Sequence, residues 1–209
     1  MGKLAELKSR VSYQTLLLAG FALLASALLG LADYNTRDVI RQRLDEDLRA
    51  SLAEVVPDRL YDNNLLEDTI IVDSNDDRLG TDQTLVYLGR KNGKVNAVSF
   101  RLVAPGGYSG PISLIMGVDK EGKVLGVRVI AHAETPGLGD KIEVSKSNWI
   151  LNFEGHSLQN LTIEQWAVKK DGGRFDQFSG ATITPRAIVK AVYQGLKFFE
   201  NHRTELLAS

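Results

Sequence analysis

The sequence predicts an α+β fold, in which a single N-terminal transmembrane helix is followed by a mainly antiparallel sheet covered by helices. Three observations predict it. Residues 13–32 contain no charged side chain. Four later segments are rich in β-branched residues, alternate in polarity and are joined by short links, at 84–88, 95–103, 112–118 and 124–131. From Thr184 onward apolar residues recur at helical spacing, which predicts a C-terminal helix covering one face of the sheet.

The apolar run at 13–32 has the length of a membrane span, because twenty helical residues extend about 30 Å. Residues 1–12 precede it as a short tail. Ala25-Ser26-Ala27 resembles a signal-peptide cleavage site, but the apolar run continues past it, which favours an uncleaved anchor. Basic residues flank both ends almost equally, so charge leaves the orientation open. They are Lys3, Lys8 and Arg10 before the span and Arg37, Arg41, Arg43 and Arg49 after it.

Residues 33–57 are predicted to form a linker helix, amphipathic from Thr36 to Ala53 and ended by Pro57. Residues 58–209 are predicted to form one domain, which is enough chain for a hydrophobic core. Its first stretch, 58–84, is polar and without clear period, and the acids at 73–77 lack the ligand spacing of a calcium loop. We therefore expect a solvated loop there.

Composition excludes several classes of function. Lys and Arg number 25 against 26 Asp and Glu, so no basic surface predicts nucleic-acid binding. The chain has no cysteine, which excludes disulfides, thiolate metal ligands, cysteine-held iron–sulfur clusters and cysteine nucleophiles. No catalytic or metal residue is expected, because Ser109 lacks a hydrolase elbow, and His132 and Glu134 have no third ligand at a usual spacing. Any redox chemistry therefore needs a bound organic cofactor.

The segment 176–185 predicts a seat for a phosphate group. We expect Thr184 to be the N-cap of the C-terminal helix and Pro185 to occupy its first position. The positive end of the helix dipole would then face Ser179 to Thr182 and favour an anion there, while Gly180 and Ala181 leave room for a bulky group. On spacing alone, an ordinary loop leading into a capped helix is the favoured interpretation of the segment.

Two glycine-rich loops lie beside the predicted strands. The strand at 124–131 is followed by a tight turn that contains Glu134, Thr135, Pro136, Gly137, Leu138 and Gly139 and leads into a helix expected at 143–151. Such a turn can lay backbone N–H groups against a flat ring. Tyr108, in the loop before the strand at 112–118, is either a neighbour that stacks on such a ring or a core aromatic residue. Trp149 and Trp166 are expected in the core.

These motifs resemble those of a known family. Asp176, Ser179, Gly180, Ala181 and Thr182 match the flavinylation motif of the FMN-binding domain shared by the G subunit of Rnf-type ion-translocating electron-transport complexes and the C subunit of the sodium-pumping NADH:quinone oxidoreductase. The turn from Glu134 to Gly139 resembles the family's second motif. The G subunit is the better match, since it is the shorter form. The resemblance implies FMN attached to Thr182 through a phosphoester, with Tyr108, Glu134, Thr135, Gly137, Leu138, Gly139 and Thr184 as cofactor-binding residues.

The resemblance also implies a location and partners. It implies a single-pass protein of the bacterial inner membrane, with the domain at 58–209 in the periplasm. The expected role is electron transfer within an ion-translocating oxidoreductase complex, without independent substrate turnover. The expected partners are the other membrane subunits, the lipid bilayer and a periplasmic flavin transferase that acts on FAD. The alternative is a membrane-anchored periplasmic structural or binding protein without a redox role.

Overall fold

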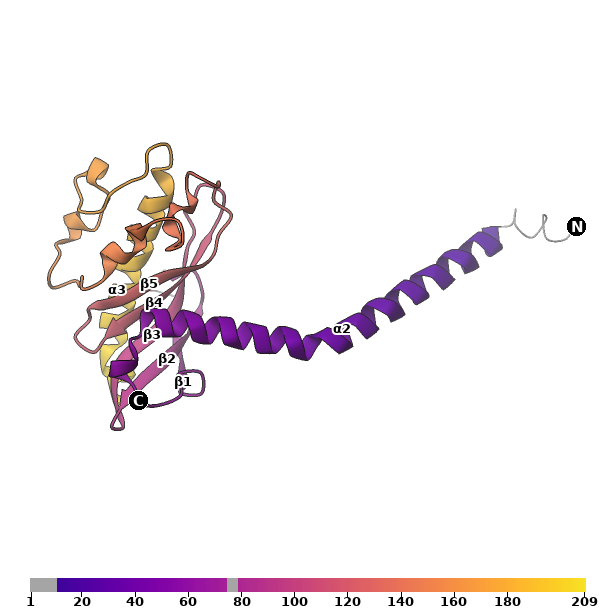
Figure 1. Ribbon diagram of the computed structural model, residues 1–209, viewed down its shortest axis with the longest axis horizontal. Coiled ribbons are helices and arrows are strands. Elements are labelled where there is room, and N and C mark those ends of the chain that lie inside the picture. Colours follow the sequence, from indigo (N-terminus) through magenta and orange to yellow (C-terminus); the bar gives the residue numbers. More distant parts are fainter. Residues whose placement is uncertain (1–10, 75–78) are drawn as a thin grey trace, which may run out of the picture. The chain divides into compact units, whose positions relative to one another are not determined.

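The computed structural model describes residues 11–74 and 79–209 (Figure 1). Residues 1–10 of the predicted tail, with the basic residues Lys3, Lys8 and Arg10, lie outside the described residues, as do Asn75, Asp76 and Asp77 of the acidic stretch at 73–77. The chain divides into two compact units, Met1–Asp47 and Leu48–Ser209. Each unit is described by itself.

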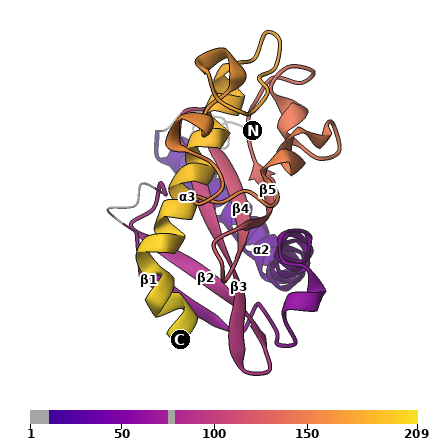
Figure 2. The ribbon, with the colours of Figure 1, turned by 90° about the vertical axis from the view of Figure 1, so that its left-hand side faces the viewer.

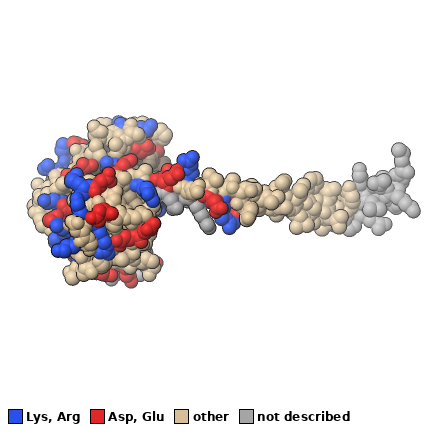
Figure 3. Space-filling model, turned by 60° about the horizontal axis from the view of Figure 1, so that its bottom comes forward, with Lys and Arg blue, Asp and Glu red and all other residues tan. Residues whose placement is uncertain are grey.

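The first unit consists, in its described part, of most of the helix α2 (Val11–Val55). Its stretch Tyr13–Ile40 is 28 residues long, contains no buried residue and is apolar enough to span a membrane. Figure 3 shows this stretch almost free of charged side chains. The predicted anchor and linker helices are one continuous helix, because no proline or glycine pair interrupts residues 33–55 and polar side chains bond one turn back. Asn35 Nδ2 donates to the Leu31 carbonyl at 2.9 Å, and Arg37 pairs with Asp33.

The second unit is built on a five-stranded antiparallel sheet in the order β1-β2-β3-β4-β5. The predicted α+β class is therefore confirmed. The strands are β1 (Thr69–Asp73), β2 (Gln83–Lys91), β3 (Lys94–Ala104), β4 (Ile112–Asp119) and β5 (Val124–Ala131). The last four are the predicted strands, and β1 lies where only a loop was expected.

One face of the sheet packs against the C-terminal helix α3 (Ile183–Ala208) (Figure 2). Alternate residues of β4 point toward this helix, and Leu114 and Met116 are fully buried in the main core. Phe100 and Phe198 meet edge to face with ring centroids 4.9 Å apart. The helix approaches closely at Gly195, where a Cβ would lie 3.1 Å from the sulfur of Met116. The C-terminal helix that was predicted to cover one face of the sheet is thus present.

The opposite face packs against the last turns of α2. Leu52 and Val55 are buried there in a smaller core with Ile115 of β4. The contact depends on Gly117, where a Cβ would lie 2.0 Å from the Val55 carbonyl oxygen. This alternation along β4, apolar on both sides, explains why the strand is almost continuously buried.

A loop-rich segment from 132 to 182 connects β5 to α3. The helix expected at 143–151 is wrong: Glu143 is extended and only short 3-10 turns form on either side of it, since Ser147 Oγ accepts the Trp149 N–H and starts a new turn. The 3-10 turns of the second unit are Asp58–Leu60, Asp140–Ile142, Asn148–Phe153, Ile163–Gln165 and Lys169–Asp171. Trp149 and Trp166 are buried, as predicted. They pack with Phe153, Phe175 and Phe178 in an aromatic cluster within this segment.

Candidate functional site

The start of α3 differs from the prediction by two residues. Thr182 is the N-cap, and its side chain makes no capping hydrogen bond, while Thr184 and Pro185 are the second and third helical residues. The prediction that Thr184 is the N-cap is wrong. Thr184 is fully buried, and its hydroxyl donates to the Glu134 carboxylate instead of capping the helix. Pro185 is tolerated at the third position, since backbone N–H groups of the first helical turn have no acceptor within the helix.

The loop before α3 is held in a tight turn. Ala181 N–H donates to the Phe178 carbonyl at 3.2 Å, and Gly180 has a φ of 80°, which a residue with a Cβ adopts only with strain. Phe178 is buried against Trp149, with ring centroids 5.2 Å apart. The aromatic cluster therefore fixes the base of the turn and leaves Ser179 and Gly180 at its exposed tip.

The turn after β5 faces this loop. The N–H groups of Leu138 and Gly139 both donate to the Thr135 carbonyl at 3.1 Å, and Gly137 has a φ of 77°. A Cβ at Gly180 would lie 3.7 Å from Leu138 Cδ2, so the two turns are in van der Waals reach. Two segments that are about forty residues apart in sequence thus form opposite walls of one cleft.

Glu134 joins the parts of the cleft. It is only 5% exposed; its Oε1 accepts the Ser109 N–H at 3.0 Å and its Oε2 accepts the Thr184 hydroxyl. The same carboxylate is packed against Gly139, where a Cβ would lie 2.6 Å from Oε2. Glu134 thereby links the loop before β4, the turn after β5 and the first turn of α3.

The cleft has a volume of about 250 Å³. Tyr108 lies at its edge and is 70% exposed, so it is not a core residue. Both apolar side chains and hydroxyls line the cleft, which suits an amphipathic ligand. The lining residues are Tyr108, Glu134, Thr135, Leu138, Gly139, Gly180, Ala181, Thr182, Ile183 and Thr184. Of the residues predicted for the site, Gly137, Asp176 and Ser179 do not line it. Sequence reasoning missed Ile183, which a helix start one residue after Thr182 brings to the cleft.

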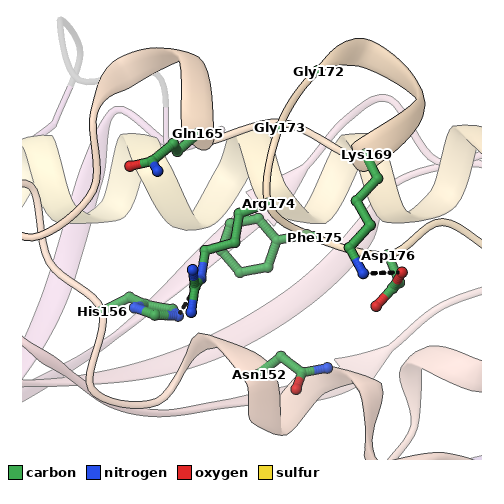
Figure 4. A pocket seen from close by; sticks show the side chains of 9 residues that line it. All are labelled: Asn152, His156, Gln165, Lys169, Gly172, Gly173, Arg174, Phe175 and Asp176. Atoms are coloured by element: carbon green, nitrogen blue, oxygen red, sulfur yellow. Dashed lines mark hydrogen bonds and ion pairs between the residues drawn. The ribbon is translucent and has the colours of Figure 1, made fainter.

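Asp176 lies in a different, polar pocket of about 530 Å³ (Figure 4). Its carboxylate pairs with Lys169 Nζ at 2.7 Å, and its backbone carbonyl accepts Trp149 Nε1–H at 2.7 Å. In the same pocket Arg174 Nε donates to His156 Nε2 at 3.3 Å. Burial, and then the charge of Arg174, lower the pKa of His156. The first residue of the motif thus fixes the loop to the domain from outside the cleft.

His132 lies just beyond the end of β5. Its Nδ1 accepts the Glu134 N–H at 3.0 Å and its Nε2 lies 2.9 Å from Glu143 Oε1. This hydrogen bond, followed by one from Ser145, lowers the pKa of Glu143. Both ring nitrogens are engaged in holding the turn, and the described residues contain no group of three side chains that could hold a metal ion.

Thr182 is the hydroxyl best placed to react. It is half-buried, lines the cleft and, among the described residues, has no hydrogen-bond partner for its side chain. The next N–H groups, of Ile183 and Thr184, belong to the first helical turn, where the helix offers them no acceptor. A phosphate on Thr182 would therefore meet free donors and the positive end of the dipole of α3. The residues present fit a phosphate ester that carries a flat, partly apolar group.

Comparison with known proteins agrees with this geometry. Residues 107–197 match the family model of the FMN-binding domain. The chain is 47% identical to the G subunit of the ion-translocating oxidoreductase complex of Shewanella loihica, over 91% of this chain and 90% of that protein. It is 48% identical to the G subunit of Shewanella amazonensis, over 91% and 88% of the two chains. It is 44% identical to the G subunit of Vibrio cholerae serotype O1, over 91% of each chain.

Proposed function

The chain belongs to the family of G subunits of ion-translocating oxidoreductase complexes and has an FMN-binding domain, and from that premise we propose that it carries FMN on Thr182 and relays electrons between other subunits. The observation that carries the proposal is the free Thr182 hydroxyl in the cleft between Tyr108, Leu138 and the start of α3. No other hydroxyl that lines the cleft combines access with a position at the helix N-terminus: Thr184 is buried and already bonded to Glu134.

Attachment of the cofactor requires a second enzyme. In the proposed step Thr182 Oγ attacks the phosphorus of the FMN half of FAD, the pyrophosphate bond breaks, AMP leaves and the hydroxyl proton passes to a base. A threonine hydroxyl is a weak nucleophile unless a base activates it. Among the described residues, Glu134 is the only carboxylate that lines the cleft, and its hydrogen bonds come from the Ser109 N–H and the Thr184 hydroxyl. It is therefore not hydrogen-bonded to the Thr182 hydroxyl. We therefore assign the activating base to a periplasmic flavin transferase.

The bound flavin supplies the electron chemistry, and the chain supplies its position. Thr182 retains the cofactor covalently, the first N–H groups of α3 hold the phosphate, and Tyr108 and Leu138 offer surfaces to the ring. None of the lining residues is arranged as an acid or base for a metabolite, which favours electron transfer over substrate conversion. A tethered cofactor in an anchored domain acts as a fixed relay, so its donor and acceptor are other subunits of the complex.

The proposed location is the bacterial inner membrane, with residues 13–32 of the apolar stretch Tyr13–Ile40 as a single span and the domain in the periplasm. Residues 13–32 contain no ionisable Asp, Glu, Lys, Arg or His side chain, and such side chains mark the ion paths of membrane proteins. Ion movement therefore belongs to the whole complex.

The test uses the full chain purified from membranes in mild detergent with its co-purifying subunits. Thr182→Ala should remove flavin fluorescence from the chain after denaturing electrophoresis and stop NADH- or ferredoxin-linked electron transfer through the complex. Thr135→Ala, a matched threonine of the same cleft, should keep the fluorescent band. Full electron transfer in a flavin-free Thr182→Ala complex would refute the relay and leave a structural or binding role.

A further inference from the structure

Glu134 differs in its charge environment from the carboxylates of the second unit that form ion pairs. Asp68 pairs with Arg90 at 2.7 Å, Glu54 with Arg128 at 2.8 Å and Asp176 with Lys169 at 2.7 Å, and all of these carboxylates are partly exposed. Glu134 is 5% exposed, and in the described part of the chain no Lys, Arg or His side chain pairs with it. Its carboxyl group is therefore buried without a cationic partner among the described residues.

Two hydrogen-bond donors hold the carboxylate of Glu134. Both of its oxygens accept, one from the Ser109 backbone N–H and the other from the Thr184 hydroxyl. Two donors stabilise the charge without neutralising it. The group also packs closely against the backbone at Gly139, where a side chain would collide with it.

Glu134 lines the cleft in which the proposed function places the flavin. The oxidised flavin ring is neutral, whereas the ring reduced by two electrons and one proton carries a negative charge. A fixed negative charge beside the ring disfavours the reduced form relative to the oxidised form, since charges near the ring tune its electronics. Resting on the proposed function, we propose that Glu134 is a positioning residue that also sets the flavin's reduction potential, holding it low so that the reduced cofactor passes its electrons on.

The size of the effect follows from Coulomb's law. A unit charge within about 10 Å of the ring, at an effective dielectric constant of about 20, changes the equilibrium between oxidised and reduced flavin by more than about tenfold. For a two-electron couple a tenfold change corresponds to about 30 mV. Salt in the solvent screens a buried charge much less than an exposed one. Glu143, a nearby carboxylate that is 38% exposed and hydrogen-bonded to His132, should therefore have a much smaller effect.

The test compares reduction potentials of full-length, flavin-loaded chains in detergent, titrated with dithionite and mediator dyes and followed by flavin absorbance. Glu134→Gln keeps the volume and an acceptor for Ser109 but removes the charge, and it should raise the potential by at least about 30 mV, a tenfold change in equilibrium. Glu143→Gln is the matched control and should change it by much less. An unchanged potential in Glu134→Gln, or an equal rise in both variants, overturns the inference.

A second variant covers the case in which Glu134→Gln does not fold. Thr184→Val keeps the shape and the charge but removes one of the two donors to Glu134, so the charge is less dispersed and the potential should fall. An unchanged or raised potential overturns the inference. If the parental chain itself carries no flavin on Thr182, the proposed function fails; if the flavin is present and indifferent to Glu134, only this inference fails.

Discussion

Two threonines two positions apart should separate stability from cofactor attachment. Thr184 is fully buried and donates to the Glu134 carboxylate, whereas Thr182 is half-buried and its hydroxyl makes no capping bond. A hydrogen bond to a charged group contributes about 1.5–3 kcal/mol. Thr184→Val should therefore lower the free energy of unfolding by about 2 kcal/mol, a fall of roughly 4–8 °C in the melting midpoint. Thr182→Val breaks no such bond and should change it by less than about 0.5 kcal/mol.

The assay is unfolding of the full chain in detergent, followed by tryptophan fluorescence, since Trp149 and Trp166 are both buried in the aromatic cluster. In-gel flavin fluorescence is recorded on the same samples. Thr184→Val should be less stable and still labelled, and Thr182→Val should be stable and unlabelled. The reasoning is refuted if the label is lost from Thr184→Val and kept on Thr182→Val, or if Thr184→Val unfolds like the parental chain.

Three further predictions concern other parts of the chain. Gly117→Ala places a Cβ 2.0 Å from the Val55 carbonyl oxygen and should destabilise the domain by about 1–3 kcal/mol in urea unfolding, whereas Gly106→Ala, with no contact closer than 3.8 Å, should not; equal stabilities would contradict the packing argument. Burial lowers the pKa of His156 below 6.5, so the unfolded chain takes up that proton first and stability falls as the pH drops below 6.5. The free energy of unfolding should depend less on pH across this range in His156→Gln, and an unchanged pH dependence would contradict the role given to His156. Protease added to intact spheroplasts should digest the domain while the mature chain retains Met1 or Gly2; a chain that begins near Asp33 would identify a cleaved signal peptide instead.

The four longer strands were predictable because their polarity pattern is local. The strand predicted at 124–131 is β5, and the one predicted at 112–118 is β4 with one residue added. β1 was not predictable in the same way, because its apolar stretch is short and flanked by acids. Its extended conformation is stabilised by antiparallel pairing with β2, in which Ile71 lies opposite Leu85. Pairing of that kind depends on a partner that local propensity does not contain.

The error at the start of α3 has the same origin. A threonine directly before a proline, together with helical periodicity, favours a cap at that threonine, and local rules therefore predict Thr184 as the N-cap. In the folded chain the hydroxyl of Thr184 donates to Glu134, which is 50 residues away in sequence. A tertiary hydrogen bond to a buried carboxylate is stronger than the cap that local rules predict, so the helix begins earlier and Thr182 takes the cap position. The composition of the cleft was therefore largely predictable from its motifs, but the bond that organises it was not.

The segment from Asp176 to Thr182, which resembles a flavinylation motif, spans two separate environments, and this division gives its spacing a physical reason. Asp176 pairs with Lys169 in the polar pocket, and its carbonyl accepts the Trp149 indole N–H, so the first residue of the motif is fixed on the domain side of the aromatic cluster. Phe178 then packs on Trp149, and the chain reverses at Gly180, where it enters the cleft. Only after this reversal can Thr182 stand at the helix start with its hydroxyl free. In the sequence these residues form one continuous motif. In the folded chain its first half holds the loop against the domain, and its second half presents the residue that we propose is modified.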